Sequence, residues 1–232
     1  MTIEATDAEV QAEHVVVPMH QLAGPTARLS FDNGVERLTV SAAAPSDALV
    51  EAHFAEPLPI VWAAEHGVHV EYPLGSRLLR RIRPSSIGLN PTIPWSIDVH
   101  GGAAHLSADL RDLTVRSLSF HAGVAHVKIR LGHPAGQCTI RVASVSSMRI
   151  ERPANVPVRL ELGSGAANLR LDDRRFGAVG GGLVDQTPGW DDSTASRLLI
   201  VATAGVNDLT VDHRTDAVPL DRSRRNHPSR PL

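Results

Sequence analysis

The sequence predicts an all-β protein whose C-terminal half is a short single-stranded β-helix with 21-residue rungs. Three observations support this fold class. A segment recurs every 21 residues, apolar and polar residues alternate within each copy, and aliphatic side chains supply most of the bulk in a chain with only 3% aromatic residues. A fixed period is the signature of stacked repeats, and alternation with period two indicates strands that bury one face.

The repeat is defined by a small residue that is followed four positions later by a large apolar one. Its first four copies begin at Gly102, Gly123, Ser144 and Gly165, each 21 residues after the copy before it. A fifth copy begins at Gly205, 40 residues after the fourth, which is 19 more than the repeat length. The spacing therefore predicts an insertion between the fourth and fifth copies.

Each copy predicts two strands joined by a turn. Alternating apolar residues precede the small residue, as in Ile97 and Val99, and follow it, as in Leu106, Ala108 and Leu110. Glycine or serine between the strands supplies the backbone freedom that a tight turn needs. Two short strands cannot bury their apolar face alone, so we expect the copies to stack at about 4.8 Å per rung.

Stacking places equivalent residues of successive copies in ladders that face a common interior. A β-sandwich is the alternative fold, because many short alternating strands also suit two packed sheets. The unbroken 21-residue register favours the β-helix. The expected inward ladder contains the large apolar residue of each copy, namely Leu106, Val127, Met148, Leu169 and Leu209.

Along the chain we expect four segments. Residues 1–19 form an N-terminal segment, and residues 20–92 form an irregular β region that caps the stack. The β-helix repeats occupy 93–213, with an insertion at 174–196 that holds too many glycine and proline residues for a regular element. The polar, proline-broken tail at 214–232 is expected to be disordered.

Composition excludes several classes of protein. A net charge of −2 argues against a nucleic-acid-binding protein. The single cysteine, Cys138, cannot form an intrachain disulfide and lies in an apolar run typical of a buried residue. No uninterrupted apolar stretch is long enough to predict a transmembrane span. The N-terminus carries acidic and no basic residues before His14, unlike a secretory signal, so a cytoplasmic location is expected.

Three features resemble a known group of bacterial domains. These are the segments 90–97 and 175–182 and the turns of the type Gly-small-x-x-Leu. They resemble adhesin-type β-helix domains, which are related to the C-terminal domain of cell-wall-active antibiotic response proteins. The resemblance covers about residues 20–213. It implies a right-handed β-helix without known enzymatic activity and, in some relatives, a role in envelope-stress signalling or attachment at the membrane.

No catalytic residue and no cofactor are predicted. The glycine run 180–182 lacks the Lys-Ser/Thr pair and the strand-to-helix context of a phosphate loop. The acidic residues Asp109, Asp112, Asp172 and Asp173 fall near strand ends rather than along one outward ladder. A small hydrolase or lyase is therefore the least favoured class of function.

Four histidines follow the repeat. His100 and His121 are 21 residues apart, as are His105 and His126, so each pair is expected to stack on neighbouring rungs and to point outward. Stacked imidazoles can share a transition metal, but a polar surface ladder is the favoured interpretation, and no metal ligand is predicted. Later copies place other polar residues at the His105 position, namely Ser147, Asn168 and Asp208.

Two segments are candidate contact surfaces. One is a group of four arginines that suits peripheral contact with anionic lipid or another acidic surface, although a solvated connector is the favoured interpretation: Arg77, Arg80, Arg81 and Arg83. The other is the insertion, which holds Phe176 and Trp190, and Phe176 is expected to be its buried anchor. A loop held on a rigid frame can offer a contact surface, but a lateral cover over an otherwise exposed strand is the favoured interpretation.

The sequence thus predicts a non-catalytic β-helix scaffold or interaction module. It is expected to bind a protein partner or to self-associate through its edges, with a link to the cell envelope. The alternative is a module that binds carbohydrate or another envelope ligand.

Overall fold

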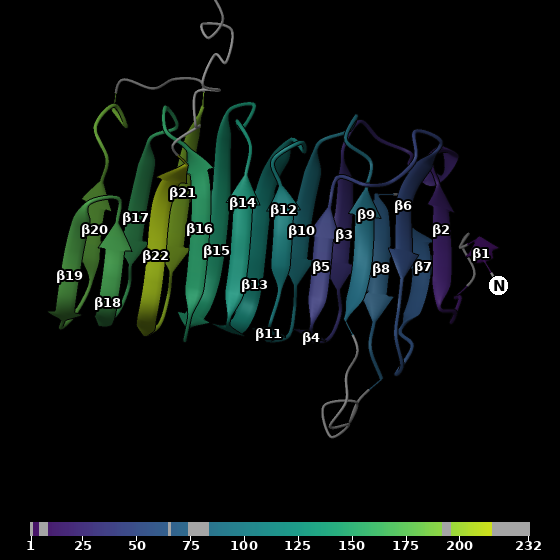
Figure 1. The fold of residues 1–232 in the computed structure, drawn as a ribbon, viewed down its shortest axis with the longest axis horizontal. Coiled ribbons are helices and arrows are strands. Elements are labelled where there is room, and N and C mark those ends of the chain that lie inside the picture. The colour runs from purple at the N-terminus through teal and green to yellow at the C-terminus, as the bar shows by residue number, and fades with distance from the viewer. Residues whose placement is uncertain (1, 5–8, 65, 74–83, 192–195, 215–232) are drawn as a thin grey trace, which may run out of the picture.

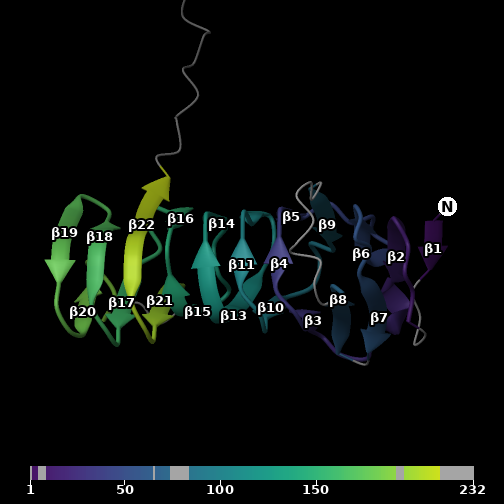
Figure 2. The same cartoon turned by 90° about the horizontal axis from the view of Figure 1, so that it is seen from below.

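The protein is an elongated stack of strands. The computed structural model describes residues 2–4, 9–64, 66–73, 84–191 and 196–214. The strands lie side by side along the long axis, with β1 at one end and β19 and β20 at the other (Figures 1 and 2). We call these the proximal and the distal end. The helical structure in the described residues is one 3-10 turn, η1 (Met19–Gln21). None of the described helices could cross a membrane. The predicted all-β class is confirmed.

The strands form two ladders that are joined at one corner. From the proximal to the distal end, the first ladder contains β7 (Ile60–Ala64), β8 (Gly67–Glu71), β3 (Ala27–Phe31), β10 (Trp95–Val99), β13 (Val115–Ala125), β15 (Gln137–Val145), β21 (Arg197–Ala202), β17 (Val158–Leu162) and β20 (Leu183–Gln186).

The second ladder runs in the same direction. It contains β1 (Thr2–Glu4), β2 (His14–Pro18), β6 (Ala48–His53), β9 (Ser85–Leu89), β5 (Leu38–Ser41), β12 (Ser107–Leu110), β14 (Val127–Leu131), β16 (Met148–Pro153), β22 (Val206–Arg214), β18 (Ala166–Leu171) and β19 (Arg174–Val179). At the corner, the short strand β11 (Ala103–Ala104) pairs with the short strand β4 (Val35–Glu36) on one side and with the end of β13 on the other.

The central rungs keep the register that the repeat predicts. Ala108 pairs with Ile129, and Ile129 pairs with Ile150, so each step is 21 residues. In the first ladder, Leu118 pairs with Ile140, 22 residues later, and the register shifts before Gly123 pairs with Ser144. A bulge in β13 therefore absorbs one residue, and the 21-residue register resumes at the corner.

The five residues predicted to form one inward row are confirmed as neighbours on successive strands of the second ladder. Val127 pairs with Met148, Met148 with Leu209, and Leu209 with Leu169. Leu106 lies one step before Val127, because the backbone N–H of Lys128 donates to its carbonyl at 2.8 Å. Each of the five ladder side chains is at most 5% exposed. One apolar cluster continues from these residues through the N-terminal strands, so both halves of the chain share a core.

The order of the rungs differs from their order in the chain. The last rung, β21 and β22, lies between the rung of β15 and β16 and the rung of β17 and β18, with parallel pairing on both sides. The chain can leave this gap because it reverses after Leu171, where Asp172 has a positive φ of 50°. β19 then returns along the outer edge of β18, and the inner edge stays available for β22. At the proximal end, β8 and β9 likewise fill the space between two rungs formed by earlier residues.

The insertion contains regular structure, and the expectation that it would not is wrong. β19 pairs antiparallel with β18, and β20 pairs antiparallel with β17, so residues 174–186 form one more rung that runs in reverse. The glycines at 180–182 are confined to the turn between these strands, where Gly181 has a φ of +102°. Breakers gathered in one turn do not interrupt the short strands on either side.

Candidate functional site

The distal end exposes the edges of the two ladders. Within the described part of the chain, β19 pairs with β18 alone and β20 pairs with β17 alone. Edge strands present backbone N–H and C=O groups that can pair with another strand. We call β19 and β20 together the distal edge.

The distal edge is fixed in place by polar contacts between its two strands. The Arg174 guanidinium donates to Asp185 Oδ1 at 2.6 Å and to the carbonyl oxygen of Gln186 at 2.9 Å. Gln186 in turn accepts a hydrogen bond from Arg159 on β17 at 3.0 Å. Val184 lies beside these groups with 60% of its surface exposed. The strands are therefore ordered, while part of their apolar surface faces water.

The two aromatic residues of the insertion lie on different ladders. Phe176 is on β19, opposite Leu169, and is only partly buried against the core. Trp190 follows β20 and is 8% exposed, and the guanidinium of Arg197 lies 5.1 Å above its ring. The expectation that Phe176 would be the more buried anchor is wrong. Since β19 is the outermost strand, nothing beyond it in the described residues covers its ring.

The segment after β20 is held by Thr187. Its backbone N–H donates to the carbonyl of Val158 at 2.8 Å, and its hydroxyl oxygen accepts from the Val158 N–H, also at 2.8 Å. These contacts extend the β17–β20 pairing toward Trp190. Whether Phe176 and Trp190 act as a contact surface stays a prediction.

An open cavity of about 480 Å³, lined by both polar and apolar residues, lies next to this segment. Its most unusual wall residue is Arg152, whose side chain is 3% exposed and forms an ion pair with Asp172. Burial lowers the pKa of Arg152, and the charge of Asp172 opposes that effect. Arg152 Nε is buried without a hydrogen-bond partner among the described residues. His213 also lines the cavity, and its Nδ1 is 3.2 Å from Asp172 Oδ1.

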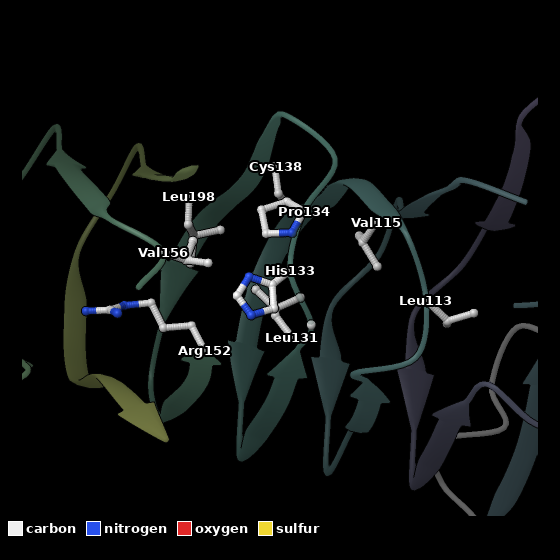
Figure 3. Close-up of a pocket in the computed structure, with 10 residues that line it drawn as sticks. Leu113, Val115, Leu131, His133, Pro134, Cys138, Arg152, Val156 and Leu198 are labelled. Carbon is white, nitrogen blue, oxygen red and sulfur yellow. The ribbon is translucent and has the colours of Figure 1, made fainter. Parts of the chain in front are cut away.

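A second cavity surrounds the only cysteine (Figure 3). It measures about 10 Å³ and is lined by Cys138, Pro134, Leu198 and other mostly apolar residues. This is room for no more than one water molecule. Burial raises the pKa of the Cys138 thiol to about 12. The thiol is therefore protonated at neutral pH and is not an activated nucleophile.

The predicted histidine pairs are stacked. The rings of His100 and His121 have centroids 4.8 Å apart, and those of His105 and His126 are 4.9 Å apart. His105 and His126 also have positive φ angles, as do Asn168 and Asp208 at the same position of later rungs. Histidine, asparagine and aspartate are enriched in this left-handed conformation. Backbone geometry thus accounts for His105, His126, Asn168 and Asp208, whereas Ser147, at the same position, does not have a positive φ.

Two clusters of metal-ligand types occur among the described residues. One contains His14, Glu51 and His53, and the other contains the residues Asp172, Asp212 and His213. Sequence reasoning missed both, because their members come from strands far apart in the chain. The predicted arginine surface, Arg77, Arg80, Arg81 and Arg83, lies outside the described residues.

Comparisons with known proteins give one family match and one similar structure. Residues 81–151 match a family model described as the N-terminal domain of toast_rack, DUF2154. No curated protein matches the chain. The crystal structure of a proposed cell adhesion protein from Clostridium sporogenes is similar, with a TM-score of 0.60, 18% sequence identity, and coverage of 89% of this chain and 99% of that chain. At this identity the likeness shows a common fold. The family model covers less than half of the chain, so it marks a local similarity.

Proposed function

We propose that this protein is a non-catalytic interaction module, in which a stack of strands presents the distal edge to a second copy of the chain. The observation that carries the proposal is that β19 and β20 each pair on one side only within the described residues. The similarity to a proposed cell adhesion protein supports an interaction role.

The composition of the distal edge favours pairing. Natural proteins protect edge strands with proline or with charges that repel a second strand. Residues 174–186 contain no proline, and one of their two arginines, Arg174, is already engaged by Asp185. Val184 adds exposed apolar surface.

A second copy fits β19 without electrostatic conflict. A two-fold interface is self-complementary, so each β19 would pair antiparallel with the other. Centred on Phe176, this pairing sets Arg175 opposite Gly177, Arg174 opposite Ala178, and the two Phe176 side chains opposite each other. Like charges are not opposed, and the exposed part of the Phe176 ring gains a cover.

We further propose that the three rungs at 95–153 are a right-handed β-helical segment with 21-residue rungs. The parallel pairing of β12, β14 and β16 supports this arrangement, and parallel crossovers are right-handed in nearly all sheets. We also propose that the chain is related to antibiotic response proteins, that it has a link to the cell envelope, and that it is located in the cytoplasm. Cell fractionation with an antibody against this chain tests the location.

The test of self-association is Gly177→Arg, which would set one new arginine opposite Arg175 of the other copy on each side of the two-fold axis. A Cβ at Gly177 meets nothing within 4 Å, so the change fits the single copy. We expect the wild-type chain to show a dimer in sedimentation velocity at high concentration and the variant to remain monomeric. Adding Arg175→Glu to Gly177→Arg should restore the dimer by opposing unlike charges. Ala135→Arg, at an exposed turn away from the distal edge, is the matched control. A monomeric wild-type chain, or a dimer that survives Gly177→Arg, contradicts the proposal.

The Arg152 cavity favours a second candidate, a module that binds carbohydrate. The observation is an open cavity whose wall holds a buried guanidinium, with its Nε unpartnered among the described residues. Saturation-transfer NMR with soluble monosaccharides, including N-acetylglucosamine, tests it. Signals that disappear in Asn155→Ala, an exposed residue of the cavity wall, support binding there, and no transfer to any sugar excludes it.

A further inference from the structure

Three side chains with metal-binding groups share the outward face of the antiparallel pair β2 and β6, near the proximal end. His14 lies directly opposite His53, and Glu51 lies two residues before His53. The neighbouring residues Val15 and Ala52 point into the core, at 0% and 1% exposure. Because side chains alternate between the faces of a strand, the two histidines and the glutamate must project together.

The ligand atoms of this cluster converge on one point. His14 Nε2 is 2.9 Å from Glu51 Oε1, and His53 Nε2 is 4.0 Å from the same oxygen. The two imidazole rings are stacked, with centroids 4.2 Å apart. In a tetrahedral zinc site with bonds of about 2.0–2.1 Å, the ligand atoms are about 3.3 Å apart. The two observed separations lie on either side of that value, so small side-chain rotations bring the atoms into position.

No lysine or arginine lies directly opposite Glu51 on the adjacent strands. The ion pairs formed by Glu51 within the described residues are with the two histidines. Its neighbours on the adjacent strands are Val16 on β2 and Gly88 on β9, and neither carries a positive charge. A metal ion that binds here does not need to displace a lysine or arginine from these positions.

The other cluster of ligand types differs in this respect. Asp172 is paired with the buried Arg152, and Asp212 lies 3.3 Å from Arg170 and 3.9 Å from Arg149. A divalent cation at that cluster would compete with three guanidinium groups. The cluster on β2 and β6 is therefore the better cation site.

We propose that His14, Glu51 and His53 bind a first-row transition metal, with zinc as the expected ion and water completing its coordination. Two imidazole nitrogens and one carboxylate oxygen are a donor set that suits zinc. His53 is 62% exposed, so the site opens to solvent. Binding ties β2 to β6 and thereby stabilises the proximal end of the stack. The competing explanation is a structural carboxylate–imidazole contact without a metal.

The experiment is calorimetric titration of the untagged full-length chain with zinc chloride at neutral pH. We expect one zinc ion per chain, and a loss of affinity of more than about tenfold in His53→Ala, since even residues behind the ligands contribute that much. Glu51→Gln should weaken binding similarly while keeping the size of the side chain. The matched control is His100→Ala/His121→Ala, which removes a stacked pair of similar geometry.

A second measurement separates the site from a purely structural contact. Zinc that binds the folded chain raises the melting temperature by linkage, and this rise should vanish in His53→Ala but persist in the His100→Ala/His121→Ala control. His53 is mostly exposed, so its removal leaves the core intact. A rise that persists in His53→Ala or vanishes in the control overturns the proposal. So does the absence of binding by the wild-type chain at millimolar zinc.

Discussion

Truncation of Ile150 tests the stacked core most directly. Ile150 lies on β16 between Ile129 of β14 and Val211 of β22, and all three side chains are 0% exposed. Strands pair with β16 on both sides, so the backbone cannot move inward to fill a void. Ile150→Ala therefore leaves a cavity in the centre of the stack.

The cost follows from the atoms removed. Ile150→Ala deletes three carbons, and at about 0.8 kcal/mol per buried methylene the lost transfer free energy is about 2.4 kcal/mol. The unfilled cavity adds to this, which gives a total of about 3–4 kcal/mol, within the range of about 2–5 kcal/mol for such substitutions. Ile150→Val removes one carbon and should cost about 1 kcal/mol.

The assay is urea unfolding followed by far-UV circular dichroism, with the free energy of unfolding extrapolated to water. Val184→Ala is the control, because Val184 is 60% exposed and such a change should stay within about 0.5 kcal/mol. If Ile150→Ala destabilises the protein no more than this control, the side chain does not lie in a packed ladder, and the reasoning fails.

Three further outcomes follow from single residues. Because burial raises the pKa of the Cys138 thiol to about 12, the folded protein should not react with a thiol reagent at pH 8, and the unfolded protein should; fast labelling of the native state would disprove this. Gly181 has a φ of +102°, so Gly181→Ala should lower the free energy of unfolding by about 1 kcal/mol or more, unlike Gly180→Ala, which has open space and no positive φ. The hydrogen bonds from Arg111 lower the pKa of Asp109. The contribution of the ionised Asp109 to stability is therefore present above the pKa of about 4 that this carboxyl has in the unfolded chain. It is lost as the pH falls through the pKa of the same carboxyl in the folded protein. Asp109→Asn should lower stability at pH 7 and have no effect at strongly acid pH; an equal loss at both would show that ionisation is not involved.

The sequence by itself determined which residues face the core. Alternation with period two leaves Ile129 and Ile150 only one face to bury, and the 21-residue repeat places them at equivalent positions. Both are confirmed as neighbours with no exposed surface. Four of the five polar residues at the His105 position also reflect the local backbone, because its left-handed conformation there favours histidine, asparagine and aspartate.

The insertion shows where local patterns mislead. Counting glycines across 174–196 predicted an irregular loop, yet strands of six and four residues form on either side of the glycine turn. The side chain with the larger aromatic surface, Trp190, became the buried one. The guanidinium of Arg197 lies over its ring, and Arg197 belongs to β21, the strand that follows the insertion.

Only the tertiary structure decided the order of the rungs and the identity of the neighbours across them. Every rung offers nearly the same edges, so a repeated sequence does not specify that β22 lies between β16 and β18. The reversal of the chain at Asp172 determines this order, because β19 then occupies the outer edge of β18 and leaves its inner edge open for β22. The cluster of His14, Glu51 and His53 has the same origin. Its members are 37 and 39 residues apart in the chain and become neighbours only because β6 runs antiparallel to β2.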